Sequence, residues 1–238
     1  VMPEPLRLPF ATRTQVFRLP LPRGLRTALP AKDQAEAALS ALLAGGEVPR
    51  LKVSRFNAQL ASAPAHVVLG APASWTDAQL RWAYVVLLRQ FGTMNDRYGK
   101  LFEVVDQGVD HTTTNAPVSK TKAATGMHTD SSDARYNPDL VALLCLQPGS
   151  RGGQSLLASA SELLARLRKS HPALEAVARM PWPRDVVTPG LAQDLSAIEA
   201  NAIPVFSGTG NGLEFRYMRY WTERAMDKLG QPVPANLT

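Results

Sequence analysis

A histidine and an aspartate two residues apart, His128 and Asp130, are the residues of this chain best suited to bind a metal ion. On an extended segment side chains alternate with period two, so both are expected on the same side. An imidazole and a carboxylate placed in this way fill two corners of a 2-His-1-carboxylate triad, which leaves positions open on Fe(II). The spacing alone is common by chance, and a structural histidine and an ordinary turn aspartate remain alternatives.

The residues after this pair predict a strand, a turn and a second strand. Seven apolar residues, 140–146, lie between Pro138-Asp139 and the turn-forming residues 148–153. A run of this length between such signals is typical of a buried strand, with Cys145 packed inside it as a small apolar residue. The run 156–159 predicts the next strand. The metal-binding pair therefore leads into sheet structure.

The segment from His128 to Ser155 resembles the TauD/TfdA group of Fe(II)- and 2-oxoglutarate-dependent oxygenases, within the clavaminate-synthase-like superfamily. The group's pattern is an H-T-D motif, a P-D-x segment before an apolar strand, an L-x-P segment, and G-G-x-S or G-G-x-T. Each part stands in this chain: His128-Thr129-Asp130, Pro138-Asp139, Leu146-Gln147-Pro148 and Gly152-Gly153-Gln154-Ser155. A weaker resemblance extends over roughly residues 64–235.

The resemblance implies an iron enzyme that uses 2-oxoglutarate and O2 as cosubstrates. His128 and Asp130 match two iron ligands, and Ser155 matches a hydroxyl that helps to bind 2-oxoglutarate. The iron and its cosubstrates supply the oxidising chemistry, while the protein holds the target carbon beside them. Iron halogenases of the superfamily have a small residue in the place of Asp130, so the carboxylate favours hydroxylation or desaturation.

A second histidine ligand is not found where the resembling family has it. There it lies in a late strand and is followed by an arginine that pairs with 2-oxoglutarate. After Ser155 this chain has only His171, which comes too early. Three interpretations stay open. Both residues and the closing strands lie beyond residue 238, or the chain is a catalytically incomplete homologue, or His66 or His111 substitutes.

Substrate-binding candidates lie near the motif and on the late part of the chain. An arginine can clamp a substrate carboxylate with two parallel hydrogen bonds. The candidates are Arg216, Arg219, Arg135 and Asn115. Structural or surface ion pairs are the alternative for the arginines, and a plain surface position is the alternative for the asparagine.

The order of helices and strands predicts one α+β domain over residues 1–238. The clearest helix is 76–91, because Thr76 can cap it and its apolar residues share one face. The other expected helices are 31–44, 161–180 with an interruption at His171-Pro172, and 222–229. Further expected strands are 15–19, 66–69, 101–105, 202–207 and 213–217, the last two forming a hairpin.

The resemblance sharpens this fold to a double-stranded β-helix, a jelly-roll core flanked by helices, with the closing strands absent from the chain. Residues 1–30 are rich in proline and are expected to form an extended N-terminal segment. Residues 106–126 are polar and lack an apolar period. We expect a loop there, either over the active site or as a plain surface loop.

Composition limits the remaining classes of protein. A chain of 238 residues with 45% hydrophobic residues can form one globular core, and its single cysteine excludes an internal disulfide. No stretch approaches about 18 uninterrupted apolar residues, so we expect no membrane partner and a cytoplasmic protein without a signal peptide. The net charge of +6 could favour nucleic acid, but the basic residues are spread thinly, so no nucleic-acid partner is expected.

The leading hypothesis is a non-haem Fe(II)/2-oxoglutarate oxygenase that hydroxylates or desaturates a small organic metabolite. We expect this metabolite to be derived from an amino acid and to belong to a biosynthetic pathway. The alternative is a catalytically incomplete jelly-roll homologue that binds a small ligand or a partner. The identity of the substrate and the oligomeric state are not readable from the sequence.

Overall fold

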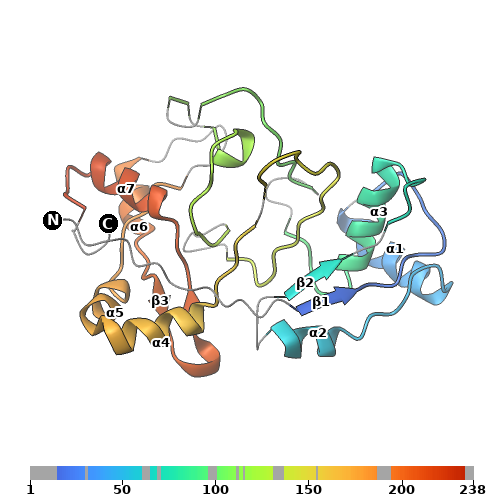
Figure 1. Ribbon diagram of the computed structural model, residues 1–238, viewed down its shortest axis with the longest axis horizontal. Coiled ribbons are helices and arrows are strands. Elements are labelled where there is room, and N and C mark those ends of the chain that lie inside the picture. The colour runs from blue at the N-terminus through green and yellow to red at the C-terminus, as the bar shows by residue number, and fades with distance from the viewer. Residues whose placement is uncertain are drawn as a thin grey trace. The chain divides into compact units, whose positions relative to one another are not determined.

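The chain folds into two compact units. The computed structural model describes residues 15–29, 32–60, 65–68, 71–95, 101–110, 113–114, 116–130, 137–153, 155–186 and 194–233. The first unit is Val1–Leu101 with Ala142–Ser159, and the second is Phe102–Val141 with Ala160–Thr238. Figure 1 shows the elements of both, coloured along the sequence. A single domain over residues 1–238 stays a prediction, since one domain can hold two compact units.

The first unit begins with a parallel strand pair joined by helices. Its elements are β1 (Gln15–Arg18), α1 (Lys32–Ala44), α2 (Val53–Leu60), β2 (Ala65–Val68) and α3 (Asp77–Leu88). β1 and β2 run parallel, with Gln15 opposite Ala65, and lie side by side in Figure 1. A parallel pair needs a long crossover connection, which here contains α1 and α2. The predictions of strands at 15–19 and 66–69 and of a helix at 31–44 are confirmed.

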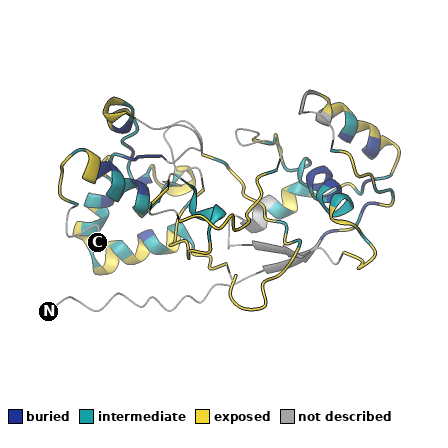
Figure 2. Cartoon of the chain, turned by 90° about the horizontal axis from the view of Figure 1, so that it is seen from above, coloured by how far each residue is buried: buried dark blue, intermediate teal, exposed yellow. Residues whose placement is uncertain are grey.

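The core of the first unit lies between α1 and α3. Its buried residues are Leu39, Leu42, Val48, Trp82, Ala83, Val86 and Leu87. Burying one large apolar side chain contributes about 1.5–3 kcal/mol, so this helix pair supplies much of the stability of the unit. Figure 2 shows buried positions in dark blue on the helices, whereas the long connections are mostly exposed.

Helix α3 starts at a complete capping box. The Thr76 hydroxyl accepts a hydrogen bond from the Gln79 backbone N–H at 3.3 Å, and the Gln79 side chain accepts one from the Thr76 backbone N–H at 2.9 Å. Two backbone donors of the first turn are thereby satisfied. The prediction that Thr76 caps this helix is confirmed.

The segments 101–105, 140–146 and 155–159 have neither strand nor helix. Apolar side chains there are exposed, including Leu143 at 73% and Leu156 at 75%, and Cys145 is exposed as well. A strand needs a partner backbone for its hydrogen bonds, and no described segment pairs with these residues. The strand predictions for 101–105, 140–146 and 156–159, and the burial of Cys145, are therefore wrong for the described structure.

The second unit combines four helices with a small hairpin in its described part. Its helices are α4 (Ala160–Ser170), α5 (Pro172–Ala178), α6 (Leu195–Ala200) and α7 (Arg219–Lys228). The 3-10 turns are η1 (Val118–Lys120) and η2 (Gly210–Gly212). The break between α4 and α5 at His171-Pro172 confirms the predicted interruption, because proline starts a helix but cannot continue one. α7 begins before the predicted residue 222, and α6 was not predicted.

The hairpin of β3 (Phe206–Ser207) and β4 (Glu214–Phe215) carries the core of the second unit. Phe206 lies opposite Phe215, with ring centroids 4.8 Å apart. Phe206 is buried with Leu164 of α4 and Ala178 of α5, and Phe215 packs against this cluster. The predicted hairpin is confirmed, although its strands are shorter than 202–207 and 213–217.

The hairpin turn requires glycine at position 208. Gly208 has a φ of +65°, and a Cβ atom there would lie 2.0 Å from the carbonyl oxygen of Gly212. That distance is far inside van der Waals contact, so any side chain would force the two backbones apart. The turn thus fixes the register between β3 and β4.

The described residues form two two-stranded sheets, β1–β2 and β3–β4. They do not by themselves confirm the double-stranded β-helix, which stays a prediction. In the described part of the chain, no helix is both long and apolar enough to cross a membrane.

Replacing the cap of α3 tests the packing of this helix. Thr76→Ala removes the oxygen that accepts from the Gln79 N–H, and we expect a loss of about 1 kcal/mol in the free energy of unfolding. Urea unfolding followed by far-UV circular dichroism measures it. Thr76→Ser keeps the oxygen and should retain most of the stability. Equal losses in both variants would mean that the methyl group, not the cap, matters.

Candidate functional site

His128 and Asp130 lie side by side, as their spacing predicts. The imidazole Nε2 atom is 3.1 Å from the Asp130 Oδ1 atom. Donors bound at about 2.1 Å to one ion in neighbouring octahedral positions lie about 3 Å apart. The distance between the two donor atoms is therefore compatible with adjacent positions around one metal ion. Both are accessible, with side-chain exposures of 28% and 48%.

The Gly126 carbonyl selects the nitrogen that His128 can offer to a metal. The imidazole Nδ1 atom lies 2.8 Å from this oxygen, which can only accept a hydrogen bond. Nδ1 therefore carries a proton, and Nε2 is the atom that faces Asp130. A hydrogen bond of this kind fixes the tautomer and the orientation of a metal-binding histidine.

When the imidazole of His128 is protonated, both of its ring nitrogens act as donors. The hydrogen bond to the Asp130 carboxylate raises the pKa of the imidazole above its usual value of 6.5, with burial opposing the rise and the Gly126 carbonyl adding to it. The protonated ring satisfies both acceptors at once. A metal ion bound at Nε2 would replace this proton and face the same carboxylate.

Thr129 attaches the pair to the segment that follows β4, far along the chain. Its backbone N–H donates to the Tyr217 carbonyl at 2.8 Å, and its hydroxyl accepts from the Tyr217 N–H at 2.9 Å. His128 forms an antiparallel bridge with Met218. The Thr129 side chain thus bonds to the backbone of Tyr217, while the side chains of His128 and Asp130 are expected on the opposite side of the segment.

Arg216 lies two residues before Met218, the residue that stands opposite His128. Directly opposed residues of antiparallel strands share a face, so His128 and Met218 do. The bridge between His128 and Met218 is isolated, and the structure describes no pairing of Asp130 with Arg216. Arg216 pairs with Glu214 at 3.2 Å, as expected for alternate residues on one side of a strand. The side of the segment that carries Met218 therefore also carries the Arg216 guanidinium and the Glu214 carboxylate.

Arg219 lies elsewhere. The sequence analysis placed it on an extension of the hairpin, but it is the first residue of α7. Its guanidinium pairs with Glu223 one turn along the helix, at 2.6 Å. This i,i+4 pair matches the structural alternative considered for it.

The other predicted site residues are placed less fully. Ser155 belongs to the first unit, where it is exposed and outside regular structure. Asn115, Arg135 and His111 lie outside the described residues, and His66 is described only as backbone in β2. In the described part of the chain, no group of three or more His, Cys, Asp and Glu side chains is placed to hold a metal ion. The roles of these residues stay predictions.

The predicted loop 106–126 belongs to the unit that holds His128. The Gln107 N–H donates to the Lys120 carbonyl at 2.9 Å, and Asp106 pairs with Lys122 at 3.4 Å. The hydrogen bond from the Gly108 N–H lowers the pKa of the exposed Asp106 carboxyl. The segment is thus tied to itself through its two halves, and a role over the active site stays a prediction.

The sequence analysis missed two adjacent buried charged residues, Arg184 and Asp185. Arg184 is 1% exposed and donates to the Arg216 carbonyl at 2.7 Å. Burial lowers the pKa of its guanidinium to about 10, helped by the nearby charge of Arg216, so it remains cationic at neutral pH. Two neighbouring charges between the apolar residues Trp182 and Val186 were the available signal.

Asp185 holds helix α7 in place. Its carboxylate pairs with Arg224 at 2.9 Å and with Lys228 at 2.8 Å, and its backbone N–H donates to the Trp221 carbonyl at 3.0 Å. The segment around Arg184 and Asp185 therefore fastens the chain on both sides of residue 218.

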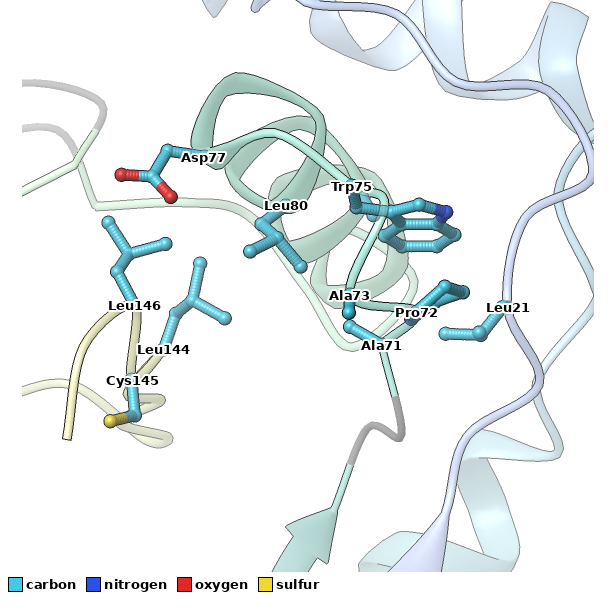
Figure 3. Close-up of a pocket in the computed structure, with 11 residues that line it drawn as sticks. Leu21, Ala71, Pro72, Ala73, Trp75, Asp77, Leu80, Leu144, Cys145 and Leu146 are labelled. Carbon is cyan, nitrogen blue, oxygen red and sulfur yellow. The ribbon is translucent and has the colours of Figure 1, made fainter.

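A separate pocket of about 390 Å³ lies in the first unit. Figure 3 shows Trp75 and Leu80 on one side of it and Leu144 and Leu146 on the other. Asp77 is the one ionisable carboxylate among its lining residues, which include none of the predicted metal ligands. All of its lining residues belong to the first unit.

Comparison with known proteins identifies the family. The family described as "Taurine catabolism dioxygenase TauD, TfdA family" matches residues 65–209, more than half of the chain. This range contains His128, Asp130 and Ser155. No curated protein and no solved structure gives a significant match. The chain belongs to the TauD/TfdA family, the family of Fe(II)/2-oxoglutarate-dependent dioxygenases.

Proposed function

We propose that the chain is a non-haem Fe(II)/2-oxoglutarate oxygenase that hydroxylates or desaturates a small organic metabolite. The observation that supports this most directly is the His128–Asp130 pair, whose Nε2 and Oδ1 atoms lie 3.1 Å apart on an accessible face. Membership of the TauD/TfdA family supports the general reaction class. Fe(II), bound together with 2-oxoglutarate and O2, supplies the oxidising chemistry.

The protein's own residues orient the reactants. The Gly126 carbonyl holds the His128 ring so that Nε2 is the donor atom, and Asp130 contributes a carboxylate beside it. Ser155 is proposed to donate its hydroxyl to 2-oxoglutarate. Because a carboxylate stands at position 130, where iron halogenases have a small residue, we expect oxygen insertion or desaturation instead of halogenation.

Arg216 is the candidate for binding the substrate. It lies two residues before Met218, which stands opposite His128, and its guanidinium can hold a carboxylate through two parallel hydrogen bonds. Glu214, which pairs with Arg216, can accept a substrate ammonium group. Adjacent groups of opposite charge suit a substrate that carries both charges, as an amino-acid-derived metabolite does. Arg219, Arg135 and Asn115 are further proposals with no comparable support.

The binding of Fe(II) and 2-oxoglutarate tests the proposed function. In an anaerobic titration, the wild-type protein should develop a weak visible charge-transfer band only when both components are present. His128→Ala removes one donor and should abolish the band. His171→Ala is the matched control, because this histidine precedes α5 and its side chain makes no capping bond. A wild-type protein without a band would favour the catalytically incomplete, ligand-binding alternative.

The acidity of His128 sets the pH range in which a metal can bind. Because its pKa is raised mainly by Asp130, we expect the metal-free ring to titrate above 6.5, and Asp130→Asn to lower this pKa. Proton and metal compete for Nε2, so Fe(II) affinity should fall as the pH falls through the raised pKa. NMR titration of the imidazole signals measures the pKa. Titration of His128 at or below 6.5 in the wild-type protein would contradict the geometry.

Arg216 and Arg219 are distinguished by a pair of variants. With a panel of free amino acids as probes, succinate formation from 2-oxoglutarate reports which of them are accepted. We expect Arg216→Gln to raise the KM of an accepted amino acid about 30-fold, from the loss of a charge-assisted contact of about 2 kcal/mol. Arg219→Gln should leave the KM close to the wild-type value. A larger effect from Arg219→Gln would move the substrate site to the start of α7.

A further inference from the structure

The starting observation is a buried cation, Arg184, in the second unit. Arg184 is 1% exposed, and its guanidinium donates to the carbonyl oxygen of Arg216. Burying a guanidinium is costly, and an apolar side chain of similar volume would fill the same space at lower cost. An apolar side chain could not donate the hydrogen bond that Arg184 gives to the Arg216 carbonyl.

The hydrogen bond from Arg184 holds the carbonyl end of the peptide group between Arg216 and Tyr217. The carbonyl of Arg216 and the N–H of Tyr217 belong to the same planar peptide group. Arg184 donates to the oxygen of this peptide group at 2.7 Å, and the Tyr217 N–H of the same group donates to the Thr129 hydroxyl at 2.9 Å. Arg184 and Thr129 thus hold the two ends of one rigid unit. A cation on the carbonyl also polarises the group and strengthens its N–H as a donor.

The peptide unit is in turn the support of the metal-binding pair. The Thr129 N–H donates to the next carbonyl, that of Tyr217, at 2.8 Å, and His128 bridges to Met218. If the peptide unit tilts, Thr129 loses its donor, and the two side chains that flank it lose their common orientation. The spacing between the Nε2 and Oδ1 atoms depends on that orientation.

We propose that Arg184 is a positioning residue for the His128–Asp130 pair, which it orients through the peptide unit between Arg216 and Tyr217. The part of the inference that concerns metal affinity rests on the proposed function. The part that concerns the peptide unit does not, and it can be measured without metal.

The metal-free test is hydrogen exchange at two amides. In Arg184→Met the Tyr217 and Thr129 amides should exchange about tenfold faster, while the Arg179 amide, which bonds to Glu175 in the helical region of α5, serves as the reference. Asp185→Asn is the matched control, because this neighbour is equally buried but holds α7 instead of the peptide unit. Unchanged exchange at Tyr217 and Thr129, or the same acceleration in Asp185→Asn, would overturn the proposal.

The second readout is the affinity for Co(II), measured calorimetrically at a temperature where every variant is folded. Arg184→Met should weaken binding about tenfold or more, the size found for residues that hold metal ligands in place. Arg184→Lys keeps a cationic donor and should recover part of the affinity. Asp185→Asn should bind Co(II) as the wild type does. Equal affinity in the wild type and Arg184→Met would overturn the positioning role while leaving the metal site intact.

A second variant decides the matter if Arg184→Met does not fold. Thr129→Val removes the hydroxyl that accepts a hydrogen bond from the Tyr217 N–H. If both residues act through that unit, adding Arg184→Lys to Thr129→Val should accelerate Tyr217 exchange no further, whereas independent effects would contradict the proposal. A wild-type protein that binds no Co(II) would refute the proposed function, and the exchange data would still judge Arg184.

Discussion

The alternation of side chains along residues 214–218 is the constraint on which the second unit depends. One face of this strand carries Phe215, which packs on the buried core beneath α4 and α5. The other carries Glu214 and Arg216, and leads to Met218 beside His128. A slip of one residue would exchange the two faces, burying charges and exposing the aromatic ring. Core packing and the arrangement of charged groups are therefore set by a single register.

The charges of the second unit are divided between two environments. Exposed pairs such as Arg219 with Glu223 are screened by water and contribute little to stability. Asp185 and Arg184 are buried, so their contacts are direct and geometrically demanding. These two residues fasten the segments on either side of residue 218, which gives a short strand the support that a wider sheet would otherwise supply.

Local signals in the sequence predicted the local features. Thr76 marks the start of α3, His171-Pro172 marks the break between α4 and α5, and the glycines around Asn211-Gly212 mark the hairpin turn. The spacing of His128 and Asp130 placed both donors on one side. Each of these depends on residues within a few positions of one another.

Features that depend on distant contacts were predicted poorly. The apolar run 140–146 has the composition of a strand but no partner backbone among the described residues. Arg184 gains its role only where the chain returns at Arg216, and Arg219 was misplaced because α7 starts without a side-chain cap. The composition of a segment indicates which secondary structure it favours, whereas its contacts with distant segments decide which structure it adopts.

The contact between Thr129 and Tyr217 spans 88 positions of the chain. At roughly 5–20 residues per second during synthesis, the partner strand emerges about 4 to 18 seconds after the motif itself. During that interval the histidine and the aspartate exist without the backbone that aligns them. If the pair binds a metal ion as proposed, the site is complete only after the chain has been synthesised through Tyr217.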